Sequence, residues 1–204
     1  MPDNKTGVVF TKNVIEFVTV ALEFCSFLEK TEGTSYIDFT DRLSKLLSLL
    51  YLKALMLPDV NDTFNLELDK EVTEFDYQFV KKGIEQILGD ADQYLDFYDT
   101  NMKETHEPVA SSIAENIADI YQDLKDFLFI FKTGQENMMN DALQACRENF
   151  KDYWGYRVVN SLRMLHFLQF NPLAMNEKQD DLTDNKSKDK DQSLRTNSNG
   201  QRAH

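Results

Sequence analysis

Hydrophobic residues recur along most of this 204-residue chain at steps of three and four, the spacing that places side chains on one face of an α-helix. The stretch from Pro108 to Gly134 shows the pattern most clearly. Its hydrophobic row is Ile113, Ile117, Ile120, Leu124, Phe127 and Phe131. Proline suits the first turn of a helix and glycine its end, so these two residues predict the limits of this helix.

Similar patterns predict helices over residues 11–30, 36–57, 73–88 and 136–170, and a shorter one over residues 90–99. The second half of the 36–57 helix is apolar nearly all round, which favours a central position. In the 73–88 helix, the row Phe75, Phe79, Gly83 and Ile87 is the expected inward face. The predicted fold is therefore all-α: a single-domain bundle of five long helices plus one short helix.

The expected domain covers residues 1–172, and residues 173–204 are expected to form a disordered polar tail. The tail contains almost no apolar residue, so burial cannot offset the entropy of ordering it. Acidic and basic residues are equally numerous from Asn171 onward, so the net charge of −13 belongs to the helical part. Such a charge disfavours nucleic acid and anionic membrane surfaces as partners, and leaves basic proteins or cationic ligands open.

The chain shows no secretory signal pattern at its first residues, and its most hydrophobic run, residues 46–57, is too short to span a bilayer. Cys25 and Cys146 lie in apolar helical patterns, as small buried hydrophobes do in a reducing compartment. These features predict a cytoplasmic protein.

No nucleophile elbow, phosphate-binding glycine loop or metal-binding H-E-x-x-H motif occurs. The sequence thus predicts no catalytic residue, metal ligand or cofactor. One alternative is a magnesium-dependent hydrolase of nucleotide-like substrates, of the all-helical pyrophosphatase type. Glu71-x-x-Glu74 and Asp96-x-x-Asp99 are a loose analogue of the carboxylate pairs that bind magnesium there.

The acidic face of the 108–134 helix is the remaining candidate site. A charged face opposite an apolar row is usually only solvated, but the last helix supplies arginines and tyrosines that could meet these acids. We expect the acids to hydrogen-bond the last helix along one edge and to leave the other edge for a partner. The candidate binding residues are Asp119, Asp123, Asp126, Tyr121, Tyr153, Trp154 and Arg157. The leading hypothesis is a non-enzymatic acidic helical domain that binds another protein, and the charge leaves a basic partner open; the sequence does not define the homo-oligomeric state.

Three stretches, "VTEFDYQFVKKGIEQILGDADQYLDFYDTNM", "ASSIAENIADIYQDLKDFLFIFKTG" and "NDALQACRENFKDYWGYRVVNSLRMLHFL", resemble an uncharacterised Bacteroidetes family of cytosolic proteins of about this length. The family is a domain of unknown function, and the resemblance covers residues 10–170. It implies an all-helical fold and brings no activity, substrate or catalytic residue.

Overall fold

The computed structural model describes residues 7–60, 63–96 and 108–171. The chain divides into two units, residues 1–166 and 167–204. In the second unit, the described residues 167–171 form the end of the last helix, where the amide of Asn171 donates to the carbonyl of Phe167 at 3.0 Å. The tail expected at residues 173–204 lies outside the described residues.

The α-helices are α1 (Lys12–Leu28), α2 (Tyr36–Leu55), α3 (Glu74–Leu88), α4 (Ile113–Lys132), α5 (Glu136–Asn149) and α6 (Gly155–Phe170). A π-helical turn, Phe150–Trp154, joins α5 to α6 as one continuous helix. The described residues therefore contain the five long helices that the sequence predicts, and the all-α class is confirmed.

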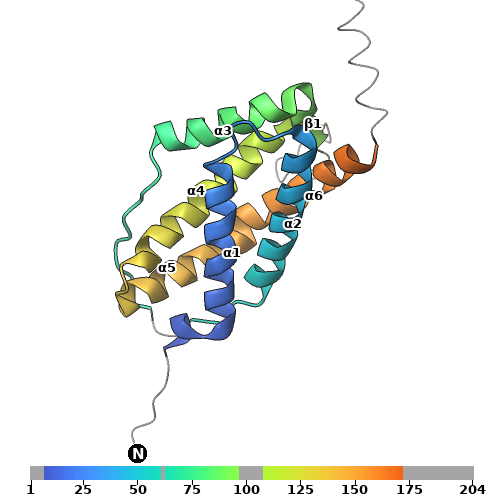
Figure 1. The fold of residues 1–204 in the computed structure, drawn as a ribbon. Helices are drawn as coiled ribbons and strands as arrows, with labels where there is room; N and C mark the ends of the chain where they lie inside the picture. The colour runs from blue at the N-terminus through green and yellow to red at the C-terminus, as the bar shows by residue number, and fades with distance from the viewer. Residues whose placement is uncertain (1–6, 61–62, 97–107, 172–204) are drawn as a thin grey trace, which may run out of the picture. The chain divides into compact units, whose positions relative to one another are not determined.

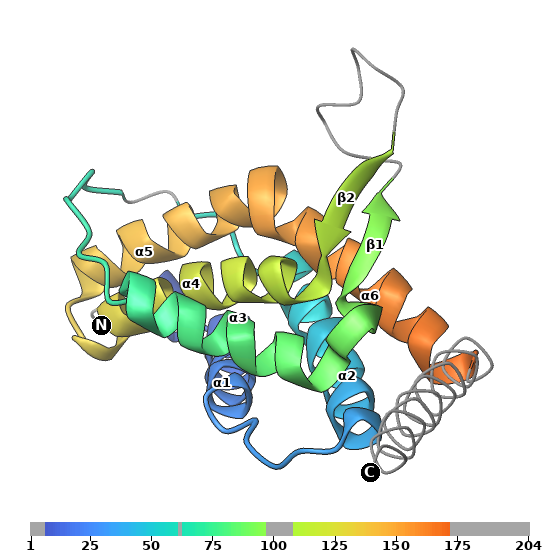
Figure 2. The ribbon, with the colours of Figure 1, turned by 90° about the horizontal axis from the view of Figure 1, so that it is seen from above.

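Helix α4 occupies the middle of the first unit. It packs against α1, α3 and α5, and the two ribbon views show it between α3 and α5, with α1 and α2 crossing on one side (Figures 1 and 2). Five of the six residues of its predicted apolar row are buried, and Phe131 is partly buried. The row therefore forms the centre of the core.

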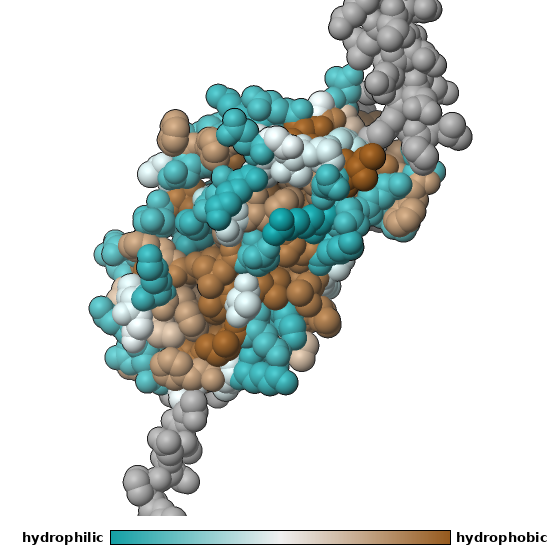
Figure 3. Space-filling view, viewed as in Figure 1, coloured by the Kyte–Doolittle hydropathy of each residue, from teal (hydrophilic) through white to brown (hydrophobic). Residues whose placement is uncertain are grey.

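The central position expected for α2 is wrong. This helix packs against α1 through one row of buried leucines and leaves Leu49, Leu52, Leu55 and Met56 exposed. Figure 3 shows that hydrophobic side chains also gather over the face that α1 crosses. An all-round apolar helix can thus lie at the edge of a bundle. None of the helices in the described residues is long and apolar enough to cross a membrane.

The short helix expected over residues 90–99 is a 3-10 turn, Gly89–Asp92, followed by strand β1, Gln93–Asp96. Strand β1 pairs antiparallel with β2, Val109–Ser112, in a two-stranded sheet. The expected helix start at Pro108 is wrong, because residues 109–112 form β2 and pair with β1. Helix α4 begins only after Ser112, whose side chain accepts from the Glu115 amide.

The π turn explains the glycine at the start of α6. The Gly155 amide donates to the carbonyl of Phe150, and a Cβ at position 155 would lie 2.3 Å from that oxygen. The backbone that approaches Gly155 so closely is therefore that of its own helix. The turn ends in Trp154, which is fully buried and donates its indole N–H to the Cys146 carbonyl at 3.2 Å.

The connection between α2 and α3 is held by carboxylates from the helices beneath it. Asp141 accepts from the amides of Phe64 and Leu66, both at 2.7 Å. Asp126 accepts from the amides of Glu71 and Val72 at 2.8 and 2.9 Å. These bonds satisfy backbone N–H groups that lie outside any helix or strand and so have no partner there.

Candidate functional site

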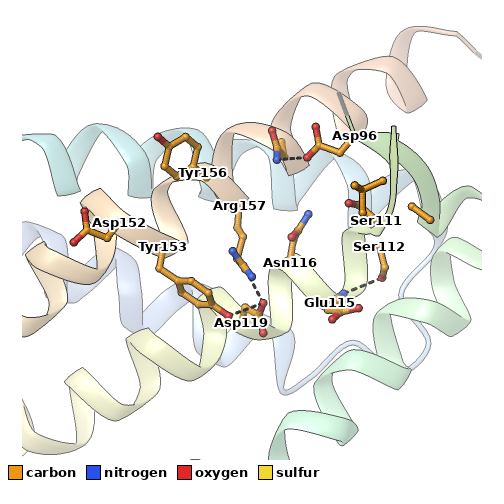
Figure 4. Close-up of a pocket in the computed structure, with 13 residues that line it drawn as sticks. Asp96, Ser111, Ser112, Glu115, Asn116, Asp119, Asp152, Tyr153, Tyr156 and Arg157 are labelled. Atoms are coloured by element: carbon orange, nitrogen blue, oxygen red, sulfur yellow. Dashed lines mark hydrogen bonds and ion pairs between the residues drawn. The ribbon is translucent and has the colours of Figure 1, made fainter. Parts of the chain in front are cut away.

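A cleft of about 380 Å³ opens between the hairpin, the first half of α4 and the start of α6. Figure 4 shows polar side chains converging on it from all three elements. It is lined by Asp96, Val109, Ala110, Ser111, Ser112, Glu115, Asn116, Asp119, Asp152, Tyr153, Tyr156, Arg157 and Asn160. The cleft is therefore almost entirely polar, apart from two residues of β2.

Asp119 forms the centre of a hydrogen-bond network in the cleft wall. Its Oδ1 accepts from the Tyr77 hydroxyl at 2.9 Å, and its Oδ2 accepts from the Tyr153 hydroxyl at 3.0 Å and from Nε of Arg157 at 2.6 Å. The Arg157 guanidinium also lies over the Tyr153 ring, 3.7 Å from its centroid. Only 13% of the Asp119 side chain is exposed, so these donors replace water around its charge.

The two tyrosines stay protonated in this environment. Burial, helped by the Asp119 carboxylate, raises the pKa of Tyr153 to about 12. Burial and the hydrogen bond to Asp119 raise the pKa of Tyr77 as well. Both hydroxyls therefore act as permanent donors to Asp119, and neither is available as a base near neutral pH.

At the hairpin end of the cleft, Asp96 is buried and accepts from the Asn160 side chain at 2.7 Å. Arg163 lies 3.8 Å from its other oxygen. The Asn116 amide donates to the Tyr94 hydroxyl at 2.8 Å. These contacts attach the hairpin to α4 and α6.

Three of the four cleft carboxylates have a cation beside them: Arg163 near Asp96, Arg157 on Asp119 and Lys81 at 3.7 Å from Glu115. The fourth, Asp152, is exposed and has no ion pair or hydrogen bond among the described residues. The Tyr156 side chain is likewise exposed. The groups open to a ligand are thus carboxylate, hydroxyl and amide oxygens.

A second cavity of about 320 Å³ lies beneath residues 68–70. Asp119 and Tyr153 line both cavities and form the wall between them. Asp123 and Asp126 line only the second, where Asp123 accepts from the Asn149 side chain at 2.8 Å. The expected hydrogen bonds between the α4 acids and the last helix are therefore confirmed for Asp119 and Asp123.

Comparison with known proteins decides the family. Residues 8–171 match DUF5063, a domain of unknown function. The chain belongs to the DUF5063 family. A crystal structure of protein BF1032 from Bacteroides fragilis is 42% identical to this DUF5063 domain, with a TM-score of 0.71 over 81% of this chain and 97% of that one. A search of curated proteins finds no match.

Four of the seven candidate residues do not line the DUF5063 cleft, and two of these, Tyr121 and Trp154, do not line the second cavity either. Tyr121 is buried against α1 and donates to Glu29 at 3.0 Å. Trp154 is a core residue stacked near Phe17, with ring centroids 6.5 Å apart. Asp126 holds the connecting segment described above. Asp119, Tyr153 and Arg157 are the candidates that the fold brings together at the cleft.

Two of the four carboxylates of the magnesium alternative, Glu74 and Asp96, accept from side-chain donors elsewhere in the DUF5063 fold. Asp96 bonds Asn160, Glu74 accepts from Gln78 at 2.9 Å, and Asp99 lies outside the described residues. Among the described residues, no three His, Cys, Asp or Glu side chains are grouped so that they could hold a metal ion. No observed contact favours the hydrolase.

Several cleft residues carry no signal in the sequence. Asn116, Asp152 and Asn160 are ordinary polar residues on helix faces, and Tyr77 lies on a different helix from its partner Asp119. Their meeting depends on how the DUF5063 helices pack. Asp96 carries no such signal either: residues of Gln93–Asp96 alternate between exposed and buried in the structure, but the sequence Gln-Tyr-Leu-Asp does not alternate between polar and apolar types.

Asp123 makes the stability of the DUF5063 domain depend on pH. Burial raises the pKa of this carboxyl from 3.8 to about 6, and its Oδ2 is buried without a partner among the described residues. Because the pKa of Asp123 is higher in the folded than in the unfolded state, the protonated carboxyl favours folding. This contribution to the free energy of unfolding is complete below about pH 4 and is lost as the pH rises through about 6. Asp123→Asn should therefore stabilise the domain by about 1–2 kcal/mol at about pH 8, after allowance for partial exposure.

Urea unfolding of the parent and the Asp123→Asn variant at about pH 4 and about pH 8 checks this. The advantage of the variant should vanish at the lower pH. An equal difference at both pH values would show that the carboxyl titrates normally.

Proposed function

We propose that this domain binds another protein and takes an extended, basic segment of that partner into the cleft. The observation that carries the proposal is the position of β2, which lines the cleft as a strand paired only on its β1 side. Among the described residues, its backbone makes no hydrogen bond to any further strand. An unpaired strand edge can accept an extended peptide as an additional strand.

The side chains around this edge support the same mode of binding. Tyr153 and Tyr156 are 42% and 57% exposed, and tyrosine supplies large contact area together with a polar tip at protein interfaces. The side-chain NH2 groups of Asn116 and Asn160 donate to Tyr94 and Asp96, so these residues offer a peptide their carbonyl oxygens as acceptors. A peptide lying along β2 would meet hydrogen-bonding groups on both of its sides.

The charge of the cleft and of the whole chain favours a basic segment. Asp152 is a carboxylate without a partner in the part of the chain that the structure describes, and Glu115 keeps 57% of its side chain exposed despite the nearby Lys81. The net charge of −13 attracts cationic segments over longer distances and disfavours nucleic acid.

Selection from a random peptide display library, with the full chain as bait, tests the proposal. Enriched peptides should contain Lys or Arg, and calorimetry should show affinity that weakens as salt is added. The variants Tyr156→Ala and Asp152→Asn should each reduce affinity by about tenfold, the equivalent of 1.4 kcal/mol. Asp41→Asn, at an exposed carboxylate on α2 outside the cleft, is the matched control and should bind as the parent does.

Enrichment of acidic peptides, or binding that ignores both cleft substitutions, would contradict the proposal.

A further inference from the structure

Helix α3 exposes two phenylalanines that the sequence pattern places in the core. Phe75 is 78% exposed and Phe79 is 55% exposed, and Phe75 is the most exposed large hydrophobic side chain of the described residues. The buried face of α3 is a different row, Val80, Ile84 and Leu88. The expected inward row is therefore wrong, and it forms an apolar ridge on the surface.

This ridge has a hollow on each side. The larger, about 820 Å³, lies between α3 and the turn at residues 31–36. The smaller, about 470 Å³, is bounded by Tyr121 and Lys125 of α4. Phe75 and Phe79 line both hollows. A protrusion beside a depression on one face is the shape required by an isologous interface, in which each copy supplies both parts.

The charges beside the ridge are ordered so that two antiparallel copies of α3 complement each other. The row next to the phenylalanines reads Glu74, Gln78, Lys82, Gln86, one acid and one base two helical turns apart. When a second α3 lies antiparallel across Gln78, the Glu74 of each copy faces the Lys82 of the other. Lys82 is exposed and has no ion pair among the described residues. Elsewhere the charge of −13 makes two copies repel.

We propose that α3 is a self-association surface, on which Phe75 and Phe79 of each copy enter the hollow beside α3 of a second copy. This surface contains none of the residues that line the cleft, so self-association is a property separate from the proposed function. Each buried aromatic ring contributes about 150–250 Å². Because each ring is already partly covered in the monomer, four rings bury less than roughly 1,000 Å², which is below the ~1,600 Å² of a standard stable interface. The dimer is therefore weak and depends on concentration.

Sedimentation velocity of the full chain over a wide concentration range tests the proposal. The parent should shift from monomer towards dimer as concentration rises. Phe75→Asp with Phe79→Asp should raise the dimer dissociation constant by about tenfold or more. The matched control is Leu22→Asp, which places the same charge on a 54% exposed apolar residue of α1 and should leave the dimer unchanged. Circular dichroism confirms that each variant is folded.

A charge exchange provides a second test that removes no hydrophobic surface. Glu74→Lys and Lys82→Glu should each weaken the dimer, because each variant places like charges opposite one another. The double variant should restore it, since the order of the charges is only reversed. A parent that stays monomeric throughout, a Leu22→Asp variant that loses the dimer, or a double variant weaker than both single ones would overturn the proposal.

Discussion

Replacing Trp154 by Ala should lower the free energy of unfolding by about 4 kcal/mol, the usual cost of removing a large aromatic ring from a core. Trp154 is fully buried between Phe17 and Phe150, whose ring centroids lie 6.5 and 4.6 Å from its own. The substitution also leaves the Cys146 carbonyl without its indole donor. Urea unfolding followed by circular dichroism measures the loss, because the variant no longer contains tryptophan.

Trp154→Phe is the matched control. It keeps a ring in the core and removes the N–H donor, so we expect a smaller loss of about 1–2 kcal/mol. Equal losses for Ala and Phe would assign the effect to the hydrogen bond instead of the packing.

Asp119→Asn should lower the free energy of unfolding by about 3 kcal/mol, because it leaves the guanidinium of Arg157 without its counter-charge while 27% of that side chain is exposed. The side-chain amide also replaces one accepting oxygen by an NH2 group. At the Oδ2 position this group would face Nε of Arg157, which cannot accept, and at the Oδ1 position the Tyr77 hydroxyl would have to accept instead of donate. Urea unfolding at neutral pH beside the parent measures the change.

Asp152→Asn provides the comparison for Asp119→Asn. It removes the same charge from an exposed carboxylate two helical positions before Trp154, and should change stability by less than about 0.5 kcal/mol. If Asp119→Asn were equally mild, the network would contribute nothing to the fold. The Asp119 carboxylate would then be a solvated group that happens to lie near donors.

The sequence predicts the long helices well because their residues repeat at helical spacing and their ends carry Ser, Thr, Gly or Pro. The apolar row of α4 is buried as expected except for Phe131, which is partly buried. Local spacing decides which residues share a face, and a long amphipathic helix has one clearly apolar face to bury.

When a helix carries two apolar faces, the local spacing of its residues does not show which face will be buried. Helix α3 carries two apolar rows, and packing against α4 buries Val80 and Ile84 while Phe75 and Phe79 face outward. Strand β1 is too short for a reliable period, and its neighbouring acids and glycine look like a helix cap. It forms because β2 offers backbone partners, which is a tertiary effect.

The candidate site is predictable in part. Asp119 and Arg157 are recognisable as a potential charge pair on two facing helices, and the structure joins them. The hairpin wall of the cleft, with Asp96 and the open edge of β2, depends on the strand pairing and has no counterpart in the predicted helices. Trp154 shows the opposite case, because an aromatic residue near a charged face is more often buried than available for binding.

The π turn at Phe150–Trp154 sets the helical phase of everything that follows it. Such a turn contains one residue more than the α-helical turn it replaces, and one residue corresponds to a rotation of about 100°. In an uninterrupted α-helix, Arg157 would point away from Asp119 and the buried Val158 would be displaced from the core. The single extra residue of this turn is therefore what aims Arg157 at Asp119, so the wall of the cleft depends on the length of the chain at this point as well as on the identity of its residues.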